Sequence, residues 1–599
     1  MVDNDEFRKN IASSPLSESI MVQAGPGSGK TTLLIERLKY IIKNRNNSLS
    51  GIACITYTNA AKDEILMRLQ NEGVHLPNEL FIGTIHSFLL ENIIKPYSYF
   101  FSKERIPFKL ASFGFSRAYK REISNMLDRP IHLIDESIFK AFESLGYDEN
   151  GKPCCYGNKI SVEISLRWKK LIFSKGYIDQ QDIIFLSYFI INKYVHIRKA
   201  ISFRFPYILV DEYQDVTFYQ EKLFSLLTYS SFFCVGDINQ SIYSFTGAKP
   251  ELFKTKSENE KYKSFTLSNN FRSTKHIVLF ANYKTEIVQV EAGKNATSEQ
   301  KVIFIKNVEK ESEAIQIFQS IQKQIKYEEK YKPYMILARR NDFIKEISHF
   351  IKNQDLQINP FLLKLKKENY RCFQILHNFL IAISLKRSNQ FEKAVDKTGE
   401  ALSYLIFNEH PNFASLAEIG YNNFMWRKLQ IYTLQFLDGS VLTETSVPEL
   451  FLKTKEFLAE QSKNLYGKNI GTKIRMLNYK WKNQKIIANN TMLSHLIEQV
   501  ELQENLYKNE GYVYNIHGAK GQEAESVLVL AQSEDQLMEW LGNNENSEEA
   551  RVGYVAFSRA RKLLCVWAPS INEENYSYLK QHIEFVDSSY IPNTEIATR

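Results

Sequence analysis

"SIMVQAGPGSGKTTLLIERLKYIIK", residues 19–43, predicts a strand, a glycine-rich loop and a helix in direct succession. Residues 20–22 form the apolar strand, and one face of the helix would contain Leu34, Leu38, Ile41 and Ile42. Glycines let successive backbone N–H groups converge on phosphate oxygens, and the helix N-terminus adds a favourable dipole. The stretch therefore predicts a phosphate-binding loop, whose nucleotide-binding residues are Ala24, Gly25, Gly27, Ser28, Gly29, Lys30, Thr31 and Thr32.

A second apolar strand delivers two adjacent carboxylates. In "YILVDEYQD", residues 207–215, the strand ends at Asp211 and Glu212. Because two carboxylates repel each other and resist desolvation, they need positive charge opposite them. Lys30 would reach the β- and γ-phosphates of ATP, and Thr31 and Asp211 would bind Mg²⁺. Glu212 would then polarise the attacking water.

A third strand, "FFCVGD" at residues 232–237, continues into a loop where the amide of Gln240 could sense the γ-phosphate. Parallel strands whose carboxyl ends converge on a helix N-terminus describe a doubly wound α/β core. The predicted chemistry is hydrolysis of a nucleoside triphosphate, with ATP and Mg²⁺ bound at that edge.

Composition bounds the class of protein. A chain of 599 residues is too long for one ordinary core, and 44% hydrophobic with 24% charged residues is typical of soluble globular proteins. No apolar run reaches the length of a membrane span, and the first residues carry no signal-peptide pattern, so we expect a cytoplasmic protein without a membrane partner. The net charge of +8 permits binding to a polyanion.

Five further motifs follow in a fixed order. They are "ITYTNAAKDEILMRL" (55–69), "GTIHSF" (83–88), "LSNNFRST" (267–274), "IHGAKGQEAESVLVL" (516–530) and "EEARVGYVAFSRARKLLCV" (548–566). Together with the first three stretches they resemble the UvrD/Rep/PcrA family of superfamily 1 DNA helicases, over roughly residues 18–345 and 510–568. The resemblance implies an α/β fold of two RecA-like P-loop lobes that clamp one ATP, each lobe carrying a mostly helical inserted domain.

The resemblance also implies roles for residues outside the phosphate loop. Arg272 and Arg559 match the two arginines that meet the γ-phosphate and complete a catalytic set of Lys30, Asp211, Glu212, Gln240, Arg272 and Arg559. Arg37 and Phe271 match positions that hold the base, and Glu523 matches an acidic residue that contacts the ribose. Gly521, in the same motif, is a further nucleotide-binding residue. The family's contacts to single-stranded DNA fall on Tyr57, Thr58, Asn59, His86, Phe245 and His517, with Phe245 where the family usually has Trp.

The implied domains alternate along the chain. Residues 1–88 and 201–280 would form lobe 1A, with inserted domain 1B at 89–200. Residues 281–369 and 506–570 would form lobe 2A, with a 2B-like insertion at 370–505 and a C-terminal tail at 571–599. Within the insertion, residues 473–485 interleave basic and aromatic side chains, which suits either a duplex- or partner-binding patch or a solvated helix face.

The sequence leaves the biological role open. The family has a glutamine upstream of the phosphate loop that reads adenine, and "FRKNIASSPLSES" has none, so the preference for ATP is open. One hypothesis is a helicase that moves 3′ to 5′ on single-stranded DNA and unwinds partly duplex DNA. The alternative is the helicase-like subunit of a Gabija anti-phage system, an NTPase that senses DNA in a hetero-oligomer with an OLD-family ATPase–TOPRIM nuclease. A nucleotide-binding scaffold without turnover is a third hypothesis.

Overall fold

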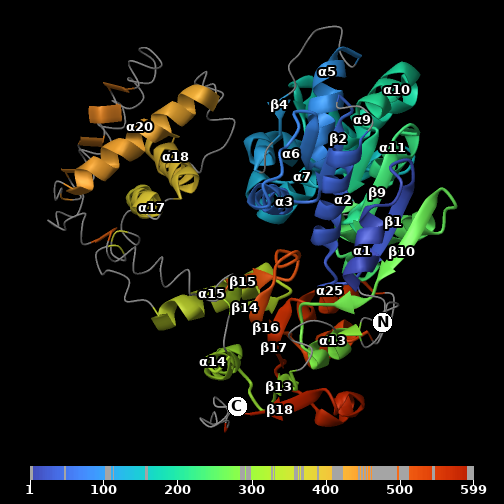
Figure 1. Ribbon diagram of the computed structural model, residues 1–599. Helices are drawn as coiled ribbons and strands as arrows, with labels where there is room; N and C mark the ends of the chain where they lie inside the picture. The colour runs from blue at the N-terminus through green and yellow to red at the C-terminus, as the bar shows by residue number, and fades with distance from the viewer. Residues whose placement is uncertain are drawn as a thin grey trace. The chain divides into compact units, whose positions relative to one another are not determined.

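The computed structural model describes much of the chain, and the gaps fall mainly in its second half. The described residues are 4–45, 49–100, 109–111, 114–155, 160–282, 290–291, 298–325, 328, 331–355, 362, 365, 370–387, 390–407, 423–442, 446, 449–450, 453–454, 456–458, 460–461, 496–497, 512–542, 547–587 and 589. The chain divides into two units, Met1–Phe350 with Gly511–Arg599, and Ile351–Glu510 (Figure 1). Each unit is described by itself below.

The first sheet of the larger unit has six strands in the order β10-β1-β9-β8-β2-β3. Their bounds are β1 Ser19–Ala24, β2 Ile52–Thr56, β3 Leu80–Thr84, β8 Tyr207–Val210, β9 Ser231–Gly236 and β10 Tyr262–Leu267. Every pairing is parallel, so all carboxyl ends meet at one edge of the sheet. This is the doubly wound core that the strand pattern predicts.

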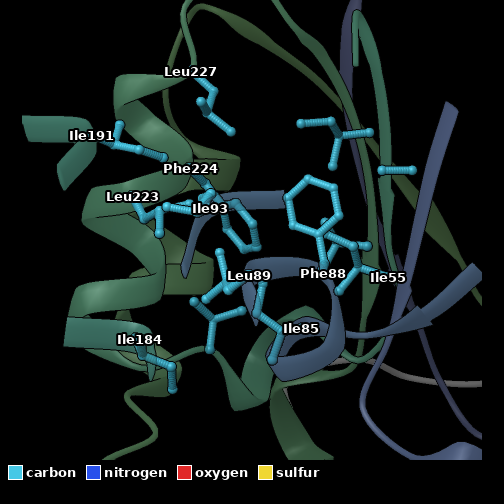
Figure 2. Packing of buried hydrophobic residues seen from close by; sticks show 14 of the residues in the cluster. Ile55, Ile85, Phe88, Leu89, Ile93, Ile184, Ile191, Leu223, Phe224 and Leu227 are labelled. Carbon is cyan, nitrogen blue, oxygen red and sulfur yellow. The ribbon is translucent and has the colours of Figure 1, made fainter. Parts of the chain in front are cut away.

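Helices cover both faces of this sheet because alternate strand residues point to opposite sides. Ile20 and Val22 pack in one core with α1 (Asn4–Ala12), α2 (Lys30–Asn44) and α3 (Asn59–Asn71). Met21 and Ile55 pack in the opposite core, whose helices are α4 (Ile85–Leu89), α9 (Gln180–Lys193), α10 (Val195–Arg204) and α11 (Phe218–Leu226). Figure 2 shows this second core, where Phe88 lies beside Ile55 and the α11 side chains Leu223 and Phe224 approach Ile93.

The second sheet also has six strands, in the order β15-β14-β16-β17-β13-β18. Their bounds are β13 Val302–Ile305, β14 Lys332–Ala338, β15 Tyr512–Asn515, β16 Ala524–Leu530, β17 Ala560–Trp567 and β18 Ile583–Val586. All pairings are parallel again. One face packs against α13 (Lys275–Ala281), α24 (Glu534–Trp540) and α25 (Glu548–Phe557), while α14 (Glu311–Gln322) contacts β16 and β17. Two RecA-like α/β lobes therefore make up this unit.

Several predicted boundaries differ from the packing. Leu89, Ile93 and Ile94 lie in the first lobe's core, so the inserted domain begins after residue 88. The smaller unit begins at Ile351, before the predicted border at residue 370. Ile277 and Phe280 of α13 lie in the second lobe's core, so this lobe begins before residue 281. The strand β18 pairs with β13, so the lobe continues past residue 570 into the predicted tail. The helices α9 and α10 bury their isoleucines in the first lobe's core, so the inserted domain ends before residue 180. Local sequence composition does not mark these borders, because they depend on which core each helix or strand packs against.

The first inserted domain has its own small core. Its helices α6 (Lys120–Leu127), α7 (Glu136–Glu143) and α8 (Val162–Ser174) pack around Phe142 and Trp168. The loop after β9 also crosses between lobes, because Ile242 is fully buried in the core of the second lobe.

The smaller unit is helical in its described part, as predicted. Its long helices are α17 (Tyr370–Arg387), α18 (Phe391–Phe407) and α20 (Asn423–Leu442), packed around a leucine-rich core. The predicted basic and aromatic patch at 473–485 lies outside the described residues. Across the described parts of the chain, no helix combines the length and apolarity that a membrane span requires.

Candidate nucleotide and DNA site

A cavity of about 360 Å³ opens between the carboxyl edge of the first lobe's sheet and the segments that lead into the strands of the second lobe's sheet. Both lobes and the segment that joins them contribute to its wall. The predicted nucleotide-site residues that line it are Gly25, Gly27, Gly29, Lys30, Thr31, Thr32, Glu212, Gln240, Phe271, Arg272, Gly521, Glu523 and Arg559. Residues separated by more than 500 positions in the sequence thus meet around one space of the size usual for small-molecule sites.

The glycine-rich loop has the backbone geometry that its sequence predicts. Gly27 and Gly29 have φ of 70° and 88°, in the left-handed region that favours glycine. A Cβ at Gly27 would lie 2.6 Å from the Cβ of Arg272, so a side chain there would clash with the joining segment. Gly29 is followed directly by α2, whose first residue is Lys30. The loop is therefore a cradle of backbone N–H groups at a helix N-terminus.

The side chain of Lys30 fits an anionic ligand. Its Nζ atom is buried and has no hydrogen-bond partner in the protein. A buried ammonium group without a partner is unfavourable unless an anion pairs with it. Together with the loop, this ammonium group matches the phosphates of a nucleotide.

The two carboxylates have opposite electrostatic environments. Burial, with the neighbouring charge of Glu212, raises the pKa of Asp211 to about 7, although Lys30 opposes this shift. For Glu212 burial would also raise the pKa, but Lys30, Lys520 and a hydrogen bond from Gln214 outweigh it and lower the pKa to about 2. Glu212 has a φ of 51°, an uncommon conformation for a non-glycine residue that often marks functional sites.

Asp211 is buried at the end of β8, and its Oδ1 accepts the backbone N–H of Glu212 at 3.0 Å. A divalent cation would offset the cost of burying this carboxylate beside Glu212. Among the described residues, no group of three or more His, Cys, Asp or Glu side chains could hold a metal ion. Thr31 and Asp211 carry oxygen atoms of the kind that Mg²⁺ prefers as ligands.

Two arginines reach the cavity from the side of the second lobe. Arg559 is only 1% exposed, and its guanidinium donates to Gln240 Oε1 at 3.1 Å and to Val555 O at 2.9 Å. Burial, with the charge of Arg272, lowers the pKa of Arg559 to about 9. Arg272 forms an ion pair with Glu523 and donates to Ser558 O at 3.1 Å. Gln240 thus connects a first-lobe loop with a second-lobe arginine.

Arg37, predicted to hold the base, does not line the cavity in this structure, and its base contact stays a prediction. Arg37 is 2% exposed, and its guanidinium donates to the carbonyls of Ala12, Ser14 and Pro15, which fastens α1 to β1. Ala24 and Ser28 are likewise buried beside the cavity and do not line it.

A different arginine lies beside Phe271. Arg8 of α1 has its guanidinium 5.2 Å from the centroid of the Phe271 ring. Phe7, Arg8, Ser28 and Phe271 also line a smaller cavity of about 50 Å³. Arg8 lies in the upstream segment that lacks the family's glutamine, so no local sequence signal pointed to it.

Three of the six predicted DNA residues, Tyr57, Phe245 and His517, gather in one aromatic cluster with Tyr243. Tyr57 stacks on Tyr243 at 5.1 Å, and His517 lies 5.4 Å from Phe245 and 5.9 Å from Tyr243, measured between ring centroids. Phe245 is 54% exposed. We call Tyr57, Tyr243, Phe245 and His517 the aromatic cluster. Thr58 caps α3 by accepting the N–H of Ala61, and Asn59 begins that helix. His86 lies on α4, apart from these rings.

Sequence reasoning missed Lys520, although it lies within the quoted stretch "IHGAKGQE". Lys520 pairs with Asp215, donates to Gln240 O at 2.7 Å, and has its Nζ 4.9 Å from the centroid of the Tyr243 ring. It also missed Arg561, which pairs with Glu523 at 3.2 Å and covers the ring of Tyr331. The contacts of Lys520 connect the carboxylate segment, the Gln240 loop and the aromatic cluster.

Comparison with known proteins agrees with this geometry. Residues 4–261 match the UvrD/REP helicase N-terminal domain, and residues 265–362 and 445–570 match the UvrD-like helicase C-terminal domain. The chain is 26% identical to the ATP-dependent DNA helicase Rep of Buchnera aphidicola subsp. Baizongia pistaciae, over 97% of this chain and 94% of that protein. It is 22% identical to the ATP-dependent DNA helicase PcrA of Staphylococcus aureus, over 91% of this chain and 80% of that protein. The chain therefore belongs to the UvrD/Rep helicase family.

Proposed function

We propose that this protein is an ATP-dependent DNA helicase that hydrolyses ATP with Mg²⁺, moves 3′ to 5′ along single-stranded DNA and separates duplex ahead of it. The observation that carries the proposal is one cavity lined by Lys30 and Glu212 from the first lobe and by Arg559 from the second. The relatives named above are ATP-dependent DNA helicases. The direction of movement rests on the family resemblance.

The catalytic residues have separable tasks. The loop N–H groups and Lys30 bind the phosphates, and Arg272 and Arg559 stabilise charge that develops on the transferred group. Mg²⁺ held by Thr31 and Asp211 would neutralise phosphate charge and orient the phosphates. With a pKa near 2, Glu212 is ionised at neutral pH and can orient an attacking water. Phosphates that engage Lys30 would weaken the main charge that lowers this pKa, so Glu212 would become a better base in the loaded site.

The contacts between lobes support coupling of DNA binding to hydrolysis. Tyr243 of the aromatic cluster donates to His517 O at 3.1 Å, across the lobe boundary. Three residues later, Lys520 contacts Asp215 and the carbonyl of Gln240. A strand that shifts the aromatic cluster would therefore shift groups that touch Gln240, and through it Arg559. Hydroxyl and imidazole groups at this surface suit sugar and phosphate contacts.

The experiment is an ATPase and strand-separation assay on the full chain. Single-stranded DNA should stimulate hydrolysis, and DNA binding should weaken steeply as salt rises. Lys30→Ala should abolish hydrolysis, and Glu212→Gln should bind ATP without cleaving it. Hydrolysis that ignores DNA, or full turnover in Glu212→Gln, would reject the proposal. A duplex with a 3′ overhang should be unwound in preference to one with a 5′ overhang.

The remaining hypotheses are less well supported. A scaffold without turnover would not need Glu212, Gln240 and two arginines around one cavity. The Gabija-type subunit with a nuclease partner stays a sequence hypothesis, because the relatives reported above carry general helicase names. An NTPase stimulated by DNA that separates no duplex of either polarity would favour it.

A further inference from the structure

A second cavity, of about 370 Å³, lies in the first inserted domain, beside the loop that carries Phe245. We call it the insertion pocket. Its aromatic wall is formed by Phe115, Phe142 and Trp168, and its polar wall includes Glu143, Gln180, Gln181 and Thr246. Phe142 and Trp168 are nearly fully buried, with ring centroids 5.1 Å apart in an edge-to-face arrangement. The aromatic wall is therefore a rigid part of the domain core.

Several polar groups at this pocket have hydrogen-bonding capacity left over. Ser116 donates its hydroxyl and its N–H to Glu143 Oε1, at 2.6 and 3.2 Å, which leaves Oε2 of that carboxylate unused. Gln180 and Gln181, in the first turn of α9, make no side-chain hydrogen bond in the described structure. A carboxylate oxygen is an acceptor only, while each amide supplies both donors and an acceptor. The pocket thus presents the partly exposed ring of Phe115, backed by the buried rings of Phe142 and Trp168, with unused acceptors and donors around it.

The charge of the pocket selects against phosphate. Glu143 and Asp179 line it, and Asp182 lies just behind Asp179. Lys169 pairs with both aspartates, and Arg117, which pairs with Glu136, also interacts electrostatically with Glu143, so carboxylates still outnumber cations around the pocket. The negative charge around the pocket would repel the phosphates of a nucleic-acid backbone. It would favour a neutral ring that carries N–H donors.

The position of the pocket connects it with the DNA site. Thr246 lines the pocket, and the residue before it is Phe245, whose ring is 54% exposed within the aromatic cluster. A single strand that passes Phe245 would therefore carry its bases past the pocket mouth. Unstacked bases are commonly held against aromatic side chains and recognised along their Watson–Crick edges.

We propose that the insertion pocket receives one unstacked nucleobase of the single strand, with guanine preferred and thymine disfavoured. This inference rests on the proposed function, because it assumes that single-stranded DNA crosses the aromatic cluster. Guanine presents two neighbouring donors, N1–H and N2–H₂, to the Glu143 carboxylate, and O6 and N7 acceptors to amide donors. Thymine offers one such donor between two carbonyl acceptors, which the carboxylates oppose. The protein would then bind some stretches of single strand more tightly than others.

The test is a binding scan by fluorescence anisotropy with the full chain. Oligo(dT) of about 16 nucleotides is compared with the same oligomer carrying one dG at successive positions. At one position dG should tighten binding about fivefold or more, since a good pair of base contacts discriminates by at least that factor. Deoxyinosine, which lacks the N2 amino group, should lose most of this gain at the same position.

Glu143→Gln is the informative variant, because its amide oxygen can still accept from Ser116 while one acceptor becomes a donor. In this variant the dG oligomer should bind no more tightly than oligo(dT). Glu163→Gln on α8, exposed and outside the pocket, is the matched control and should keep the preference. Equal affinity for dG and dT at every position, or a preference that survives in Glu143→Gln, would overturn the inference. If oligo(dT) itself fails to bind, the proposed function fails and the inference falls with it.

Discussion

Replacing Arg559 by alanine tests how the two lobes share one reaction. The guanidinium is held by Val555 O, Gln240 Oε1, Ser558 Oγ and Gln522 O at 2.9–3.3 Å, so it is fixed in place before the reaction begins. With a pKa near 9 it stays charged at pH 7.5, by about thirty to one. Arginines in this role accelerate phosphoryl transfer about 10³- to 10⁵-fold, which corresponds to about 4–7 kcal/mol.

We expect Arg559→Ala to lie near the lower end of that range, because Arg272 remains. Steady-state ATPase with saturating single-stranded DNA should show kcat about 10³-fold lower, while KM changes only a few-fold because Lys30 and the loop N–H groups still bind the phosphates. Arg559→Lys should recover part of kcat, since it restores charge without the planar fork. Arg121→Ala, an exposed arginine on α6, is the control for lost charge. If the substitution raises only KM, or lowers kcat by less than tenfold, the assignment of Arg559 to the transition state is refuted.

Three further predictions follow from contacts around the site. Lys520→Ala removes the ion pair with Asp215 and the bond to Gln240 O, so basal hydrolysis should persist while stimulation by DNA falls several-fold; undiminished stimulation would contradict the coupling role. Burial, with the charge of Arg339, lowers the pKa of His517 to about 4, so this ring is neutral above about pH 5 and gains charge only on further acidification. The affinity for single-stranded DNA should therefore show no change caused by His517 between pH 5.5 and 8. If the affinity of the wild type rises as the pH falls through 6.5, and that of His517→Gln does not, the prediction is disproved. Arg8→Ala removes the cation beside Phe271, so KM for ATP and GTP should rise several-fold with kcat nearly constant, and identical KM values would exclude a base contact.

The sequence alone was enough to predict the positions of residues that directly follow a strand of the first sheet. The phosphate loop and the Asp211–Glu212 pair follow directly from strands that end at one sheet edge, and the structure brings them together at the predicted edge. The contacts of the Arg37 guanidinium with the carbonyls of Ala12, Ser14 and Pro15 could not be predicted, because a motif position does not tell which backbone groups a side chain meets. Arg8 escaped notice because its relation to Phe271 depends on how α1 packs, which no local pattern encodes.

The same limit applies to the borders of the lobes. The helix α13 follows a first-lobe motif in the sequence, yet its apolar side chains complete the second lobe's core. Lys520 could have been found, since it stands three residues after the predicted DNA contact His517, but its partner Asp215 is more than 300 residues away. Side-chain contacts across the cleft depend on tertiary packing, which the sequence pattern did not reveal.

The burial of Ile242 limits how far the two lobes can move apart. This side chain leaves the first lobe's sheet edge and is enclosed by the second lobe. Wide separation of the two halves would expose it to water, at a cost of about 2–3 kcal/mol for one such side chain. A small rotation of the lobes about this buried isoleucine therefore costs less free energy than their wide separation, so we expect changes of nucleotide state to produce small rather than large lobe movements.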